Sequence, residues 1–269
     1  MDDASFYQIL DHFNLSRKGY RKVRKGVKKR LSQHMQKLGC ASVGDYMAAV
    51  SRAPEIETEC RMNLTVSISR FFRDGRLWDV LENTQLAKLI STCGSIFRVW
   101  SCGCARGEEA YSFKILWDRL RYVAPNLPPL ALWATDINPA FIEMAKQGVY
   151  GISSLKELPR EDVNRYFDQV TRKQRYVVKP FLKEGIRFDH HDITRHQPSA
   201  SQFEVVLVRN NLLTYYRNPE KELALESILG ALVRGGMLII GSHEKLPVGF
   251  GAMKASSDHP WIFFKPHTT

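Results

Sequence analysis

One segment, from Ile96 to Leu116, constrains the fold of this chain more than any other. It begins with a short apolar run, is interrupted at Gly103 and Gly107, and continues with apolar residues at helical spacing. This order predicts a β-strand, a tight loop and an α-helix. Such a unit opens a doubly wound α/β sheet, whose first loop approaches a nucleotide-like cofactor through its glycines and the free N–H groups of the following helix.

The predicted loop carries carboxylates, whereas a phosphate-binding loop is rich in glycine. Glu108 and Glu109 would repel an anion, so the loop favours a cofactor with a positively charged end. S-adenosyl-L-methionine (SAM) fits, because it joins a sulfonium and an ammonium group to a ribose and an adenine. The alternative is that Gly103 and Gly107 only separate a strand from a helix.

A second apolar segment, Leu130–Thr135, ends directly at Asp136. In doubly wound folds an acid at this point binds ribose, because one carboxylate accepts hydrogen bonds from both hydroxyls. Asn138 and Pro139 predict the start of the next helix. Later elements are expected in the order strand 186–188, strand 203–208, helix 220–233, a turn at Gly235 and Gly236, strand 237–240 and closing antiparallel strands within 252–265.

Composition limits the class of protein. The 269 residues suffice for one large domain and a small one, and 44% hydrophobic with 25% charged residues is typical of a soluble globular protein. No apolar run approaches the roughly 20 residues that span a bilayer, and no secretory signal precedes the first helix, so we expect a cytoplasmic protein without membrane insertion. Five cysteines without a framework spacing indicate reduced thiols, and no metal site is expected.

The first 60 residues predict a small helical domain with one strongly basic helix. Ten Lys or Arg residues lie between Arg17 and Lys37, and no acid occurs between Asp11 and Asp45. Such runs are usually only solvated, but like charges stacked along a helix destabilise it, which suggests a partner that neutralises them. An acidic helical protein surface and a nucleic acid are the two candidates. The few aromatic residues among the basic ones argue against single-strand stacking.

Four motifs together resemble those of CheR-type chemoreceptor methyltransferases, which form methyl esters on glutamate side chains. They lie at residues 64–74, 99–112, 134–150 and 209–216. The resemblance implies a Rossmann-like, SAM-dependent methyltransferase domain at 76–269 behind a helical domain at 1–60, with an active-site linker at 61–75. It also implies a short basic β insertion at about 171–188, where some members grip a receptor tail.

The resemblance also implies roles for individual residues. Arg73, Tyr215 and Arg209 correspond to residues at the methyl-transfer site, with Tyr216 as the alternative to Tyr215. Residues implied to bind SAM, or its product S-adenosyl-L-homocysteine (SAH), are Ser67, Ser69, Arg73, Gly103, Glu108, Asp136, Ile137, Asp192, Ile193, Arg209 and Asn210. Ser67 and Ser69 replace the family's Asn and Thr. The ammonium group would face Glu108 or Glu109, and Asp192 would lie at the adenine edge.

The chemistry expected of these residues is simple. A carboxylate acceptor is already ionised at neutral pH, so its methylation needs alignment rather than a general base. The leading hypothesis is therefore methyl transfer to glutamate side chains of a receptor-like protein, through contact with the receptor's cytoplasmic domain. A SAM-dependent enzyme acting on RNA or a small molecule, and a non-catalytic SAM-binding signalling module, are the alternatives.

Overall fold

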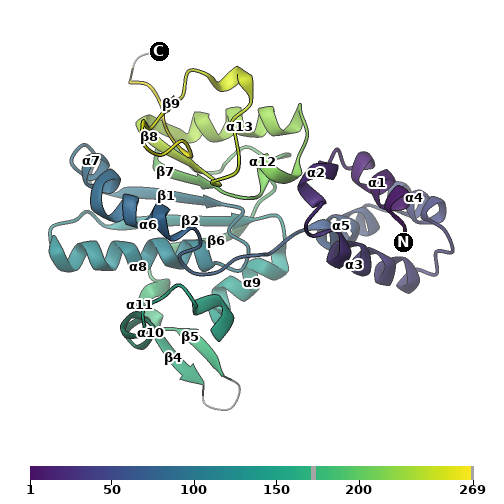
Figure 1. Ribbon diagram of the computed structural model, residues 1–269, viewed down its shortest axis with the longest axis horizontal. Coiled ribbons are helices and arrows are strands. Elements are labelled where there is room, and N and C mark those ends of the chain that lie inside the picture. Colours follow the sequence, from purple (N-terminus) through teal and green to yellow (C-terminus); the bar gives the residue numbers. More distant parts are fainter. Residues whose placement is uncertain (171–173, 268–269) are drawn as a thin grey trace.

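The N-terminal region is a bundle of short helices. The computed structural model describes residues 1–170 and 174–267. Its first helices are α1 (Asp3–His12), α2 (Arg17–Tyr20), α3 (Arg24–Lys37), α4 (Val43–Arg52) and α5 (Pro54–Leu64). Their buried residues form a core of their own, centred on Phe6, Leu10, Leu31 and Tyr46. Figure 1 shows the bundle on the side toward which β1 and β2 point.

Local signals explain where these helices begin and end. Ser42 and Asp45 form a reciprocal capping box at the start of α4. Gly39 follows the end of α3 and adopts a left-handed φ of 69°, which terminates the helix. Helix α5, whose first residue is Pro54, was not predicted from the sequence. Proline lacks an N–H donor, which the first turn of a helix does not need, so it suits this position.

A seven-stranded sheet organises the rest of the chain. Its order is β6-β2-β1-β7-β8-β10-β9, in which the first five strands run parallel and the last two antiparallel to their neighbours. The strands are β1 (Phe97–Cys102), β2 (Leu130–Asp136), β6 (Ile186–His190), β7 (Phe203–Val208), β8 (Leu232–Ile240), β9 (Lys254–Ala255) and β10 (Ile262–Phe264). The doubly wound α/β class predicted from the sequence is confirmed.

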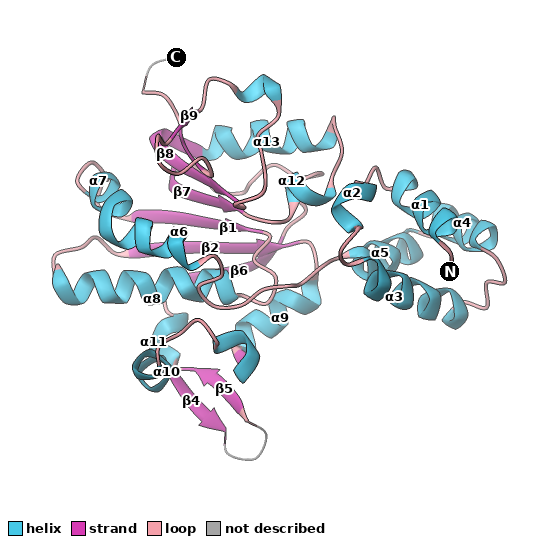
Figure 2. Ribbon diagram, in the orientation of Figure 1, coloured by secondary structure: helices cyan, strands magenta, loops and turns pink. Residues whose placement is uncertain are grey.

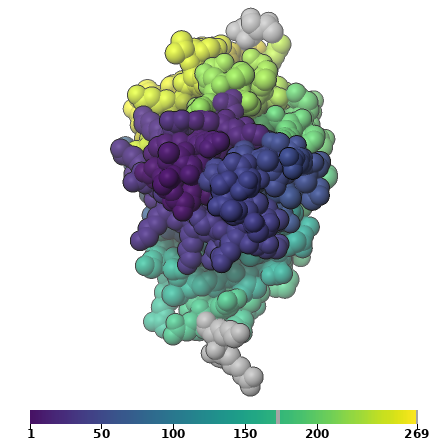
Figure 3. Space-filling model, turned by 90° about the vertical axis from the view of Figure 1, so that its right-hand side faces the viewer, coloured from purple at the N-terminus to yellow at the C-terminus, as the bar shows by residue number. Residues whose placement is uncertain are grey.

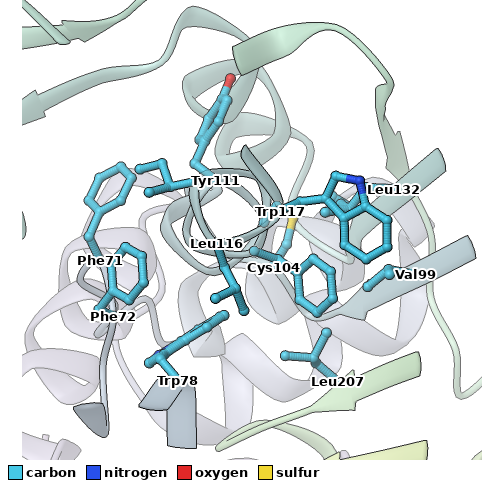
Figure 4. Packing of buried hydrophobic residues seen from close by; sticks show 14 of the residues in the cluster. Phe71, Phe72, Trp78, Val99, Cys104, Tyr111, Leu116, Trp117, Leu132 and Leu207 are labelled. Atoms are coloured by element: carbon cyan, nitrogen blue, oxygen red, sulfur yellow. The ribbon is translucent and has the colours of Figure 1, made fainter. Parts of the chain in front are cut away.

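Helices cover both faces of this sheet (Figures 1 and 2). One face carries α6 (Gly75–Val80), a π-helical turn (Leu81–Gln85), α7 (Leu86–Ile90), α8 (Glu108–Val123) and α9 (Pro139–Gln147). The other carries α12 (Leu212–Tyr215) and α13 (Glu220–Ala231). Because successive strand residues point to opposite faces, Val99 belongs to the first core and Trp100 to the second. Figure 4 shows Phe71, Trp78 and Leu207 packed around α8.

A small sheet extends below α8 and α9 in Figure 1. It contains β3 (Val149–Gly151), β5 (Arg175–Val178) and β4 (Phe167–Val170), in that order, beside a 3-10 turn (Ile152–Leu155), α10 (Arg160–Tyr166) and α11 (Pro180–Lys183). The hairpin begins earlier than the predicted insertion at 171–188. The second half of that range forms α11 and β6, because Pro180 starts a helix and Ile186 pairs with β2. Residues 171–173 lie outside the described residues.

The end of the sheet differs from the prediction in one detail. Gly235 and Gly236, expected as a turn, lie inside β8, where Gly235 adopts a left-handed φ of 74°. A glycine in that conformation allows the strand to bend without steric strain. The closing strands expected within 252–265 are β9 and β10. Among the described residues, no helix is both long and apolar enough to cross a bilayer.

Candidate active site

A cavity lies where the carboxyl ends of β1, β2 and β7 meet the linker after α5 and the N-terminal bundle. Figure 3 views the molecule from this side, with the purple and blue bundle in front. Most of the residues implied by the resemblance line the cavity: Ser69, Arg73, Gly103, Asp136, Ile137, Asp192, Ile193, Arg209, Asn210 and Tyr215. Ser67 and Glu108 are not among its lining residues. Tyr216 lines it together with Tyr215.

The loop after β1 is shaped by one glycine. Gly103 has a φ of 81°, and a Cβ at this position would lie 1.8 Å from the Nδ2 atom of Asn211. The backbone N–H groups of Gly103 and Cys104 both donate to the Thr135 carbonyl at 2.8 Å. The loop is therefore tied directly to the end of β2, and only glycine fits at its first position.

Asp136 ends β2 in a buried but hydrogen-bonded position. Its Oδ2 accepts from the N–H of Ala105 and its Oδ1 from the N–H of Asn138, each at 2.9 Å. The residue is only 8% exposed, and burial raises the pKa of its carboxyl to about 6. Each oxygen keeps a further lone pair, so the carboxylate can accept hydroxyl donors from the cavity.

A buried ion network forms a second wall. Arg209, at the end of β7, donates from Nη1 to Glu109 at 2.9 Å and from Nη2 to Asp74 at 2.7 Å. The hydroxyl of Ser101 donates to the other oxygen of Glu109 at 2.7 Å. The Arg209 side chain is 3% exposed, so its charge is compensated almost entirely by these two carboxylates.

Glu108 and Glu109 have different environments although they are neighbours. Glu108 is fully buried, and its nearest cationic atom is Nη2 of Arg106, 3.5 Å away. Neither of its carboxylate oxygens forms a hydrogen bond within the described part of the chain, and burial raises its pKa. One helical step rotates a side chain by about 100°, which is why only Glu109 faces the cavity.

Arg73 and Tyr215 approach the cavity from opposite segments of the chain. Arg73 donates from Nη1 to the carbonyl of Ile68 at 2.7 Å, and its own carbonyl accepts from the indole of Trp78 at 2.9 Å. Burial raises the pKa of Tyr215, and the positive charge of Arg73 acts in the opposite direction. The guanidinium therefore lies close enough to act electrostatically on the phenol.

Asp192 follows β6 at the far side of the cavity. Its Oδ1 accepts from the N–H of Thr194 at 3.0 Å and from that residue's hydroxyl at 2.6 Å. Apolar side chains stand beside it in the lining, among them Ile137, Phe141 and Ile193. Apolar walls with carboxylate acceptors at three points suit a flat base, a ribose whose hydroxyls donate, and a positively charged end group.

Several non-glycine residues around the cavity have left-handed backbones. Phe72, Asp74, Ala105 and Asn210 have φ angles between 49° and 61°. Each such conformation costs of order 1 kcal/mol and persists only where the surroundings enforce it. In Ala105 the left-handed conformation directs the backbone N–H toward Asp136, to which it donates a hydrogen bond.

Comparisons with known proteins agree with this geometry. Residues 67–262 match the sequence model of the family described as CheR methyltransferase, SAM binding domain. The chain belongs to the CheR methyltransferase family. It is 28% identical over 227 residues to a chemotaxis protein methyltransferase of Listeria innocua, covering 84% of each chain. It is also 28% identical to chemotaxis protein methyltransferase 1 of Pseudomonas aeruginosa, covering 82% of this chain and 81% of the relative.

The family match confirms the cofactor predicted from the sequence, since the matched CheR domain is the one that binds SAM. The sequence did not identify several further residues of the site, among them Asn211 and Tyr20, which line the cavity, and Asp74, which pairs with Arg209 beside it. Asp74 closes the linker motif and Asn211 follows the Arg209-Asn210 pair, so their positions next to motifs were a usable signal. No sequence signal indicated Tyr20, because it lies in the N-terminal bundle and reaches the cavity only through tertiary packing.

Proposed function

We propose that this CheR-family chain transfers the methyl group of SAM to glutamate carboxylates of an acidic, helical, chemoreceptor-like protein. The observation that carries the proposal is the polarity of the cavity. The carboxylates of Asp136 and Glu109 line one part, and the guanidinium of Arg73 lines another beside Tyr215. A cationic donor and an anionic acceptor would thus each meet side chains of opposite charge.

The carboxylates would hold the cofactor. Asp136 would accept hydrogen bonds from the ribose hydroxyls, Asp192 would lie at the adenine edge, and Glu109 would face the ammonium group, a role the sequence had left open between Glu108 and Glu109. When bound, SAM supplies an electrophilic methyl group on a sulfonium. Apolar neighbours such as Ile137 and Ile193 exclude water and strengthen these electrostatic contacts.

Arg73 would orient the acceptor. A planar guanidinium binds a carboxylate through two parallel hydrogen bonds, which aligns one oxygen for in-line attack. Glutamate is ionised at neutral pH, so no side chain has to remove a proton before transfer. Tyr215 would complete the pocket as a hydroxyl donor to the same carboxylate.

The N-terminal bundle offers a surface for an acidic partner. Five exposed cations on α2, α3 and the turn between them form no ion pair among the described residues: Lys18, Arg21, Lys22, Lys25 and Lys29. We call this set the basic surface. Their mutual repulsion costs helix stability and would be relieved by an acidic helical protein.

The test is a labelling reaction with tritiated SAM and the cytoplasmic fragment of a chemoreceptor. The proposal predicts label in the fragment that mild alkali releases as methanol, because esters hydrolyse under conditions that leave N-methyl groups intact. Arg73→Ala should abolish the labelling. Alkali-stable label, or label in added RNA only, would contradict the proposal.

A further inference from the structure

The N-terminal bundle contacts the backbone around Tyr215, the tyrosine proposed for the active site. The N–H of Ser16 donates to the Tyr215 carbonyl at 2.8 Å, and the N–H of Arg217 donates to the Asn14 carbonyl at 3.1 Å. Leu15, between Asn14 and Ser16, forms an antiparallel bridge with Tyr216. A strand-like ladder therefore joins the start of α2 to the end of α12, which carries Tyr215.

Gly19 lies where α2 packs directly against α12. A Cβ on Gly19 would lie 2.1 Å from the carbonyl oxygen of Thr214 and 3.4 Å from the Cα of Tyr215. Both atoms belong to the backbone, so the clash could be relieved only by moving one helix away from the other. The next residue, Tyr20, is 3% exposed and packs its ring 4.9 Å, centroid to centroid, from the ring of Tyr215.

The same part of the bundle holds the opposite wall of the cavity. The hydroxyl of Tyr20 donates to the Leu64 carbonyl at 3.0 Å. Arg30 of α3 donates to the carbonyl of Asn63 at 3.0 Å and to that of Thr65 at 2.6 Å. These carbonyls end α5 and begin the linker that leads to Arg73. Tyr20 thus contacts both the helix of Tyr215 and the linker of Arg73.

We infer that Gly19 and Tyr20 are positioning residues, which set Tyr215 for methyl transfer and link the basic surface to the active site. This inference rests on the function proposed above for Tyr215. Lys18 and Arg21 of the basic surface directly flank Gly19 and Tyr20 in sequence. A partner seated on the cations therefore acts on the same short segment that fixes the tyrosine. The coupling requires no long pathway, because one helical turn makes both contacts.

A double-mutant cycle separates positioning from general packing. Gly19→Ala should lower kcat about 10- to 100-fold, since displacements of about 1 Å have effects of this size, and should leave the SAH dissociation constant unchanged. Tyr215→Phe should lower kcat by itself. If Gly19 acts through Tyr215, adding Gly19→Ala to Tyr215→Phe should cause little further loss. Gly44→Ala is the matched control, because its Cβ would meet only Ser42 Oγ at an ordinary 3.5 Å.

The outcomes are distinct. Normal kcat in Gly19→Ala, or multiplicative losses in the double variant, would overturn the inference while leaving the proposed function intact. Normal kcat in Tyr215→Phe would instead remove the role of Tyr215 from the proposed function and the inference with it. Should Gly19→Ala fail to fold, Tyr20 carries the test. Tyr20→Phe keeps the ring beside Tyr215 and loses only the hydroxyl bond to Leu64, so it should lower kcat less than Tyr20→Leu does, with SAH affinity unchanged in both. Equal kcat for the two variants would overturn the inference.

Discussion

Nη1 of Arg209 lies 2.9 Å from Oε2 of Glu109, joining the end of β7 to the first turn of α8 along one wall of the cavity. The two side chains are 3% and 13% exposed. Water therefore compensates neither charge. Besides each other, Arg209 contacts Asp74, and Glu109 accepts a hydrogen bond from Ser101. The pair contributes to the shape of the site and to the stability of the fold at once.

Removing one member of this pair should destabilise the protein strongly. We expect Arg209→Met to lower the free energy of unfolding by about 3 to 5 kcal/mol, because it leaves the mostly buried Glu109 and the half-buried Asp74 without their cation. Urea denaturation measures this change. Adding Glu109→Gln to the variant should cost less than the sum of the two single losses.

The matched control is Arg187→Met, at an ion pair with Asp189 in which the arginine is 71% exposed. Exposed pairs are screened by water, so we expect a change below about 1 kcal/mol. Equal losses for Arg187→Met and Arg209→Met would contradict the assignment of a buried network.

Arg73 should affect transfer more than cofactor affinity. We expect Arg73→Ala to reduce kcat/KM for the protein acceptor by about 100-fold or more, because the acceptor carboxylate loses its bidentate partner. SAH affinity, measured by calorimetry, should change little. Arg73→Lys should recover only part of the activity, since an ammonium group cannot bind both oxygens in one plane.

Arg76→Ala serves as the control for Arg73. Arg76 is exposed, lies three residues further along and is not among the cavity residues. It should retain activity. An active Arg73→Ala enzyme would show that another group orients the acceptor.

Charge reversal on the basic surface should weaken binding of the acceptor. We expect Lys25→Glu combined with Lys29→Glu to raise KM for an acidic acceptor at low salt, with kcat nearly unchanged, because rim charges act mainly on encounter rates. The difference from wild type should shrink at about 1 M salt, where charges are screened within about 3 Å. Lys88→Glu on α7 is the control. A salt-independent KM in all three proteins would argue against electrostatic docking.

Much of the fold follows from local patterns. The strand before Gly103, the helix after Gly107 and the acid after the second strand all lie where periodicity and turn residues indicate. These signals are short-range, because a strand, a loop and a helix start are each specified by adjacent residues. The short range of these signals also explains why a turn was wrongly predicted at Gly235 and Gly236, which lie in β8. These glycines pair with Lys265, about 30 residues further along the chain, whereas two adjacent glycines by themselves are typical of a turn.

The site was harder to predict where it depends on the orientation of a helix or on packing between segments that are distant in sequence. Glu108 and Glu109 are chemically identical, and only the orientation of α8 distinguishes the buried one from the one facing the cavity. Tyr20 reaches Tyr215 through the docking of the bundle, which no local pattern encodes. Tyr215 and Tyr216 both line the cavity, so the choice between them needs the kinetics proposed above.

The affinity for SAM should depend on pH through Asp136. Burial raises the pKa of this carboxyl from 3.8 to about 6. Below about pH 6 the protonated acid loses acceptor capacity, so SAM affinity should fall by up to about tenfold for each further pH unit. Calorimetry between about pH 5 and about pH 8 measures this trend. A flat profile would contradict it.

Loss of folding cannot produce the same trend through this group. Because the folded pKa exceeds the unfolded one, the stability that Asp136 contributes is present at low pH and declines as the pH rises through about 6. Affinity and stability should therefore change in opposite directions with pH. Thermal unfolding of the free protein over the same range provides the control.

The central claim, that the cavity between β1 and β2 binds the methyl donor with Asp136 on its ribose, is tested most directly by calorimetric titration of SAH. The comparison is between wild type, Asp136→Ala and the exposed Asp168→Ala on β4. We predict that Asp136→Ala binds at least about tenfold more weakly, as expected for lost hydrogen bonds to a charged group, and that Asp168→Ala binds like wild type. Equal affinities in all three proteins would contradict the account.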